Sequence, residues 1–465
     1  MISKLVLGGF KSFFHHQELK LGKFSILLGT NASGKSNICD ALRFLHGIAR
    51  GYTLLEIMNE KRGIGGELIW KGIRGGLKEI YHNIQRNNSD KTLDVFSLIV
   101  KILTQNPERV LDYDVCIMIE PNKNPSIVIE SLELDANEIY RFSPESTDEL
   151  KKTIQLNENE TIEVRILEGR SAELNVSKER PILTQMTEDL DEKLLKYALA
   201  TQIKKRMKGN DGKVTLSSGL TLHIMGKEES LWLENSRYLK QTLSVLQSMR
   251  FFDLNPEAMR VPSLTGQTVL GEQGENLSSV LHAICEQEDT KANLLEWLGA
   301  LTPMDATDFK FYTDPYTNKV LAILIESNGQ ETSLYSASDG TLRFLAILAA
   351  LFSPTPASLY FFEEIENGIH PSRLYLLVEL LEERAKSGIQ IIATTHSPQL
   401  LNLVSQTTLE NSSLIYRAGD HHSSQIMPIL EIPNIKEILE KQEIAKLYAT
   451  GWFEDIMEFM QEDSQ

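Results

Sequence analysis

Residues 29–36 read Gly-Thr-Asn-Ala-Ser-Gly-Lys-Ser, an uninterrupted match to the pattern G-x-x-x-x-G-K-[ST]. An apolar run from Phe24 to Leu28 precedes this loop, and an apolar-periodic stretch from Asn37 to about Ala49 follows it. A strand, a glycine-containing loop and a helix in this order form the unit in which such a loop cradles phosphate groups. The sequence therefore predicts an α/β fold organised around a phosphate loop.

The residues of the loop have separate expected roles. Gly29 and Gly34 let the backbone wrap a phosphate with inward N–H groups, and the helix starting near Lys35 points its partial positive end at the anion. We expect Lys35 to reach the β- and γ-phosphates of ATP and Ser36 to offer its hydroxyl oxygen to Mg²⁺. The expected nucleotide-binding residues of the loop are Gly29, Thr30, Asn31, Ala32, Ser33, Gly34, Lys35 and Ser36.

Two carboxylates end a buried-strand pattern in the last third of the chain. The apolar residues Leu359 to Phe362 lead directly into Glu363 and Glu364. A site that hydrolyses a nucleotide needs one acid for the metal shell and another to position or deprotonate the attacking water. We therefore assign Glu363 to the metal and Glu364 to the water.

A histidine follows the next predicted strand. The apolar run from Ile389 to Ala393 continues into Thr-Thr-His-Ser-Pro, which places His396 at the carboxyl end of a neighbouring strand. Helical patterns after Gly340 and after Pro371 alternate with these strands, and such alternation indicates a parallel sheet with crossover helices. Because ligands bind at the carboxyl ends of parallel strands, we expect His396 to hydrogen-bond the γ-phosphate.

A small, glycine-containing loop lies between the phosphate loop and the acidic strand end. It includes Ser338, Asp339 and Gly340 and precedes an apolar helix from Phe344 to Phe352. Ser338 and the N–H groups at the helix start can hold a phosphate, but not the one that Lys35 of the same chain binds.

This order of motifs resembles the ABC-class ATPases of the RecF, SMC and OLD kind, and in particular stand-alone bacterial ATPases of the AAA family. The resemblance implies an ABC-type ATPase head, that is, a P-loop fold with a parallel core sheet and an antiparallel β subdomain. It implies that Ser338, Asp339 and Gly340 cap ATP held by a second copy, so that a homodimer or higher homo-oligomer encloses the nucleotides. It also implies that Lys11 approaches the phosphates and that residues 366–371 link the two sites. In that family the metal-binding acid is usually Asp, whereas Glu363 places its carboxylate one methylene farther out.

Composition and charge narrow the class of protein. The 47 basic and 64 acidic residues give a net charge of −17, which argues against a surface that coats nucleic acid through its phosphates. No apolar run approaches the roughly 20 residues that span a bilayer, and no secretory signal pattern opens the sequence, so we expect no membrane contact and a cytoplasmic protein. Cys39, Cys116 and Cys285 are widely spaced, so the sequence supports neither a disulfide framework nor a cysteine zinc site.

We expect four parts along the chain. Residues 1–177 form an N-terminal ATPase lobe that contains the phosphate loop and an antiparallel sheet from about 94 to 175. Residues 178–290 form a compact, mainly helical insertion, because no heptads of a long coiled coil are sustained there. Residues 291–440 form a C-terminal ATPase lobe, and residues 441–465 form an acidic tail.

Three functions compete. The leading hypothesis is an ATPase that closes on ATP and controls a separate effector, a nuclease or toxin, in prokaryotic anti-phage defence. After His396 the sequence shows no acidic D-x-D cluster of a metal-dependent nuclease, so we expect any cutting activity to belong to a partner. The alternative is a DNA-repair or recombination ATPase of RecF or SMC character that clamps DNA. The third, the ATPase subunit of a membrane transporter, is disfavoured by the large insertion and the long intervals between motifs.

Overall fold

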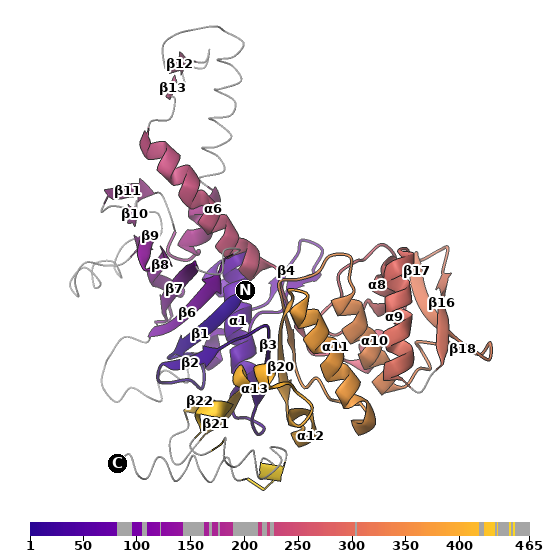
Figure 1. Cartoon of the computed structure of the whole chain (residues 1–465). Coiled ribbons are helices and arrows are strands. Elements are labelled where there is room, and N and C mark those ends of the chain that lie inside the picture. The colour runs from indigo at the N-terminus through magenta and orange to yellow at the C-terminus, as the bar shows by residue number, and fades with distance from the viewer. Residues whose placement is uncertain are drawn as a thin grey trace. The chain divides into compact units, whose positions relative to one another are not determined.

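The computed structural model describes residues 1–80, 95–104, 109–120, 122–142, 162–166, 170–174, 177–188, 213–215, 221–223, 227–302, 305–417 and 423–432, with 435, 446–447 and 450–451. These residues fall into two compact units. The core unit comprises Met1, residues 17–39 and residues from 248 onwards, and the sheet unit comprises residues 2–16 and 40–247. Each unit is described by itself below and is coloured by residue number in Figure 1.

A mixed sheet forms the centre of the core unit (Figure 1). Its strand order is β14-β19-β20-β3-β21-β22, with bounds Met249–Phe252, Leu359–Phe362, Gln390–Thr395, Phe24–Leu28, Ser413–Arg417 and Ser424–Pro428. The first five strands pair in parallel, and β22 pairs antiparallel with β21. Every residue of β3, β19 and β20 is buried, because both faces of such a sheet are covered.

The strand register aligns the functional ends of this sheet. Phe362 at the end of β19 pairs with Ala393 of β20, and Thr395 at the end of β20 pairs with Leu28 at the end of β3. The loops that follow these three strands therefore start from one edge of the sheet, where the carboxyl ends of parallel strands bind ligands.

Helices and a second, smaller sheet complete the core unit (Figure 1). Helix α10 (Asp339–Leu351) buries all but three of its residues. Helices α8 (Leu277–Cys285) and α9 (Glu288–Leu301) pack on a small antiparallel sheet. The strands of that sheet are β15 (Ser263–Leu264), β16 (Ala306–Thr313), β17 (Lys319–Glu326) and β18 (Glu331–Ser333). The remaining elements are β2 (Gln17–Lys20), α7 (Pro256–Met259), α11 (Leu374–Lys386), α12 (Pro398–Leu401) and α13 (Gln406–Glu410), with single-turn helices at Pro371–Arg373 and Ile429–Glu431.

The sheet unit contains an antiparallel run of seven strands in the order β11-β10-β9-β8-β7-β6-β1. Burial alternates along β6, as expected for a strand with one face on a core. The aromatic rings of Phe10, Phe44 and Phe96 pack together in that core, with centroids of Phe10 and Phe96 5.3 Å apart and those of Phe44 and Phe96 5.5 Å apart. The strand bounds are β1 Ile2–Gly8, β6 Val95–Leu103, β7 Val110–Met118, β8 Ser126–Leu134, β9 Asn137–Phe142, β10 Ile162–Ile166 and β11 Arg170–Leu174.

The other elements of this unit are the short helix α2 (Leu54–Met58), the hairpin of β4 (Lys61–Arg62) and β5 (Leu68–Trp70), the hairpin of β12 (Lys213–Thr215) and β13 (Thr221–His223), a helical turn at 182–188 and the long helix α6 (Lys227–Gln247). Helix α1 (Lys35–Ala49) begins in the core unit, and its residues from Asp40 onwards belong to the sheet unit.

The sequence-based fold class is confirmed, and so is the antiparallel sheet expected from about 94 to 175. The compact units divide the chain at other points than the expected boundaries at 177/178 and 290/291. Strand β14 pairs with β19, and the residues from 248 onwards belong to the core unit. The division into four parts stays a prediction. Residues 189–212 of the expected insertion, and nearly all of the expected acidic tail, lie outside the described residues. No helix within the described ranges is both long and apolar enough to cross a bilayer.

A fully buried carboxylate ties a helical turn to the antiparallel sheet. Glu130 of β8 accepts hydrogen bonds from the hydroxyls of Tyr113 and Tyr140, each at 3.0 Å. It also accepts the N–H groups of Ile182 and Leu183, at 2.7 and 2.8 Å, which open the helical turn at 182–188. Burial raises the pKa of Glu130, although these four donors oppose the shift. The carboxylate therefore joins a turn far along the chain to the centre of the sheet.

Replacing Glu130 with Gln should lower the free energy of unfolding of the sheet unit by about 2 kcal/mol. The NH2 group of the new side chain would face an N–H or O–H group that now donates to Glu130, and that group would lose its acceptor. Hydrogen exchange at the Ile182 and Leu183 amides should accelerate in the variant. Glu133→Gln, on the same strand but not fully buried, is the matched control. Unchanged protection of both amides in the Glu130→Gln variant would contradict this account.

Candidate nucleotide site

The phosphate loop connects the central strand β3 to helix α1. Gly29 has a φ of 150°, and a Cβ there would lie 2.1 Å from the carbonyl oxygen of Ile415, so no larger residue fits without moving β21. The Nζ of Lys35 donates to the carbonyls of Gly29 at 2.7 Å and Thr30 at 2.8 Å. The lysine thus lies against the loop that it is expected to complete around a phosphate.

The ammonium group of Lys35 has an unusual environment. Burial lowers its pKa to about 8, and the carboxylates of Glu364, Glu366 and Glu363 oppose that shift. A partly desolvated cation beside several acids is well suited to bind a polyphosphate, since the added negative charge favours its protonated form.

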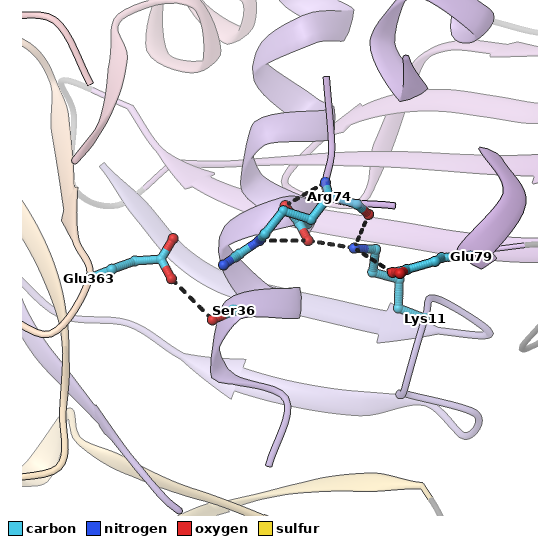
Figure 2. Close-up of polar contacts among 6 residues, drawn as sticks. Lys11, Ser36, Arg74, Glu79 and Glu363 are labelled. Atoms are coloured by element: carbon cyan, nitrogen blue, oxygen red, sulfur yellow. Dashed lines mark hydrogen bonds and ion pairs between the residues drawn. The ribbon is translucent and has the colours of Figure 1, made fainter. Parts of the chain in front are cut away.

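Ser36 and Glu363 meet across the edge of the core sheet. The hydroxyl of Ser36, in the first turn of α1, donates to Oε2 of Glu363 at 3.0 Å, and Figure 2 shows the carboxylate facing the serine. Both groups offer oxygen atoms, the ligands that magnesium and similar hard cations prefer. The extra methylene of Glu363 therefore does not prevent this acid from reaching Ser36.

Glu364 adopts a backbone conformation that is rare for its residue type. Its φ of 47° lies in the left-handed region, where a residue with a side chain is strained, and such strain recurs at functional sites. Its Oε1 lies 3.6 Å from Nε2 of His396, and the side-chain amide of Asn367 donates to its Oε2. The backbone N–H of Glu364 donates to Oγ1 of Thr394 at 2.9 Å.

The structure therefore brings together the acid and the histidine that the sequence placed on neighbouring strand ends. Sequence reasoning did not single out Asn367 or Thr394, which hold Glu364 in place. Both lie within stretches that the motif order had marked, and only their contacts distinguish them from their neighbours.

The loop before α10 is built as a helix cap. Oγ of Ser338 accepts the N–H of Thr341 at 3.2 Å, while Ser338 and Asp339 are exposed. A Cβ on Gly340 would lie 2.6 Å from the carbonyl oxygen of Gly368, so this position requires glycine to approach the segment after β19. The loop is thus packed on one side and open on the other.

Arg260 holds this loop, and sequence reasoning assigned it no role. Its guanidinium donates to the carbonyls of Ala337 at 2.6 Å and Tyr335 at 3.2 Å, and it pairs with the carboxylate of Asp339. Arg260 ends the stretch Asn-Pro-Glu-Ala-Met-Arg. Its partners lie more than 70 residues away in the sequence, so the local pattern does not reveal the contact.

Lys11 belongs to the sheet unit and is almost fully buried. Its Nζ donates to Oδ2 of Asp40 and to the carbonyl of Arg74, both at 2.6 Å, and lies 3.9 Å from Glu79 (Figure 2). A direct contact of this ammonium with a phosphate would require it to leave Asp40. The contact inferred from the family resemblance stays a prediction.

Part of the chain is similar to a known family. Residues 225–402 match the family described as "AAA domain, putative AbiEii toxin, Type IV TA system". A protein of Helicobacter pylori (strain ATCC 700392 / 26695) described as "ATP/GTP phosphatase" is 26% identical over 98 residues, which cover 20% of this chain. The chain spans about a quarter of the length of that curated relative, 26%.

Solved structures with a similar arrangement include SMC head domains. One, a head bound to the C-terminal winged-helix domain of ScpA, covers 92% of this chain and 97% of its own at 13% identity and a TM-score of 0.46. Another, from Thermotoga maritima, covers 92% and 98% at 11% identity and a TM-score of 0.39.

The fold and the site define a phosphate-loop α/β protein with a candidate nucleotide site at the carboxyl edge of a parallel sheet. The phosphate loop at the end of β3, the acidic end of β19 and the histidine after β20 meet at this edge. Within the chain, residues 225–402 carry the part that matches the AAA-domain family.

Nucleotide binding should become weaker as the pH rises above 8. Without nucleotide, Lys35 loses its proton near pH 8, whereas bound phosphates favour the ammonium, so binding above this pH takes up a proton. We expect the Kd to increase by up to about tenfold per pH unit between pH 8.5 and 9.5. Isothermal titration calorimetry in two buffers of different ionisation enthalpy measures the uptake, and a value of zero at pH 8.5 would exclude Lys35 as the titrating group.

Proposed function

We propose that this protein hydrolyses ATP at sites that two copies complete, and that the resulting closure and opening control a separate effector protein. The observation that carries the proposal is the meeting of Ser36, Glu363, Glu364 and His396 at the carboxyl edge of one parallel sheet. The match of residues 225–402 to an AAA-domain family supports a nucleotide as the substrate.

Each residue of the edge has a proposed task. The phosphate loop and Lys35 bind the β- and γ-phosphates, and Ser36 with Glu363 holds Mg²⁺, which neutralises phosphate charge when bound. Glu364 orients the attacking water and accepts its proton. His396, next to Glu364, donates a hydrogen bond to the γ-phosphate. The strained backbone of Glu364 is consistent with a side chain held in one orientation for this task.

The second copy supplies the loop of Ser338, Asp339 and Gly340. Ser338 and Asp339 are exposed at the N-terminal end of α10, a helix of 13 residues whose positive end favours an anion. Arg260 keeps the loop in one conformation, so little ordering is needed when it meets a nucleotide. We infer a homodimer with two enclosed ATP molecules, able to extend to larger assemblies.

The controlled effector is a nuclease or toxin of prokaryotic anti-phage defence. This part of the proposal is supported by the matched family, whose description includes a toxin of a type IV toxin–antitoxin system. We propose a cytoplasmic location for this system. The alternative of a DNA clamp makes a different prediction, namely salt-dependent binding of duplex DNA that ATP strengthens.

Replacing Glu364 with Gln should lower kcat for ATP hydrolysis at least a hundredfold and leave ATP binding within about threefold, because the amide cannot accept the proton of water. The variant should accumulate as an ATP-bound dimer in size-exclusion chromatography with light scattering. Glu379→Gln on the exposed face of α11 is the control. Wild-type turnover in Glu364→Gln would rule out this acid as the group that acts on water.

Completion of the site by a second copy can be tested by mixing two inactive variants. Lys35→Ala disables the phosphate loop and Ser338→Arg blocks the exposed loop, yet a mixed dimer contains one site in which both parts are intact. An equimolar mixture should therefore recover about a quarter of the wild-type ATPase activity, since half of its dimers are mixed and each has one working site. If the mixture stays as inactive as its components, the loop of Ser338 acts in its own chain or not at all.

A further inference from the structure

Glu366 lies at the same edge of the core sheet as Glu363 and Glu364. The family resemblance places it in the segment that links the two sites but gives its carboxylate no chemical role. Glu366 lies three residues after Glu363, in the turn that follows β19. Its Oε1 accepts the backbone N–H of His396 at 2.7 Å and that of Ser397 at 3.0 Å. One carboxylate oxygen thus binds two consecutive N–H groups of the turn after β20.

We propose that Glu366 is a positioning residue for ATP hydrolysis, one that fixes the backbone of His396 so that the imidazole stands beside Glu364. The inference rests on the proposed roles of Glu364 and His396 and adds a residue to them. The evidence for this role lies in the contacts just beyond the last residue pair of β19 and β20.

Regular pairing stops at Phe362 and Ala393, but contacts between the two chain segments continue. Thr394 accepts two N–H groups beyond the last strand pair: its Oγ1 binds the N–H of Glu364, and its carbonyl binds the N–H of Ile365 at 3.2 Å. Glu366 then adds the next connection, from its side chain to the turn of His396. The two turns are therefore joined at successive residues by both backbone and side-chain hydrogen bonds that continue beyond the sheet.

The segment that carries Glu366 is itself anchored. Ile365 and Ile369 on either side of it are buried in the hydrophobic core, and the N–H of Ile369 donates to the carbonyl of Glu366 at 3.0 Å. Because its backbone cannot shift easily, the carboxylate acts as a fixed point for the turn of His396.

The two oxygens of Glu366 differ, and the difference allows a selective test. Oε2 is buried and has no hydrogen-bond partner within the described residues, whereas Oε1 carries both contacts to the turn. Replacement by Gln keeps an oxygen at Oε1 and removes the negative charge, whereas replacement by Ala removes both. The pair of variants separates the backbone contacts from the charge that Glu366 adds near Lys35.

Glu366→Ala should lower kcat at least tenfold while KM for ATP stays within about twofold, because the phosphate loop is untouched. Glu366→Gln should keep at least a third of the wild-type kcat. In a double-mutant cycle, Glu366→Ala combined with His396→Ala should be no slower than His396→Ala alone, since both changes remove the same action. An equal further loss in the double variant, or a Gln variant as slow as the Ala variant, would overturn the proposal.

Hydrogen exchange measured on the same variants tests the contact of Glu366 separately from the proposed role of His396. The amide of His396 should exchange at least tenfold faster in Glu366→Ala and stay protected in Glu366→Gln, with Glu379→Ala as the surface control. The amide of Ser397 should respond less, because it also donates to Oγ1 of Thr395 at 2.9 Å. Unchanged exchange in Glu366→Ala would refute the positioning contact itself. If exchange rises as expected while His396→Ala hydrolyses ATP at the wild-type rate, the contact stands and the proposed role of His396 fails.

Discussion

The parallel register of β19, β20 and β3 is the constraint on which the site depends. Because Phe362 pairs with Ala393 and Thr395 with Leu28, three loops distant in sequence begin at one edge. The hydrogen bonds of the sheet fix this alignment, and all three strands are completely buried. The pairing of the strands therefore brings the phosphate loop, the two acids and the histidine to one place. Contacts among their own side chains are not needed for this.

The charged groups at this edge of the sheet determine which ligands it can bind. Glu363, Glu364 and Glu366 lie close enough to Lys35 to oppose the effect of burial on its pKa, so the ammonium group lies near several acids. A triphosphate would add further negative charge, and the oxygens of Ser36 and Glu363 suit a divalent cation that offsets it.

Rigid contacts around the edge limit its freedom. Thr394, Glu366 and Asn367 hold the turns that carry Glu364 and His396, and Arg260 holds the exposed loop before α10. A similar principle operates in the sheet unit, where Glu130 ties a helical turn to the strands through four donors. In both places a buried or half-buried polar side chain, and not apolar packing alone, sets where a loop lies.

The sequence by itself determined the class of fold and the core of the site, because these depend on local patterns. Two such patterns can be recognised without knowledge of the rest of the chain. One is a loop motif with a strand before it and a helix after it, and the other is a pair of acids at the end of an apolar run. The expected helix from Asn37 to Ala49 differs from α1 only at its start, and the strand pattern near 94–175 appears as antiparallel strands.

Only the tertiary structure decided which residues support the site and where the compact units divide. Arg260, Glu366, Asn367 and Thr394 are ordinary polar residues in the sequence, and their roles arise from partners brought near by strand pairing and helix packing. Strand β14 joins the core sheet for the same reason, because a short apolar strand does not reveal its neighbour. Local patterns specify elements, whereas long-range hydrogen bonds and burial specify which elements meet.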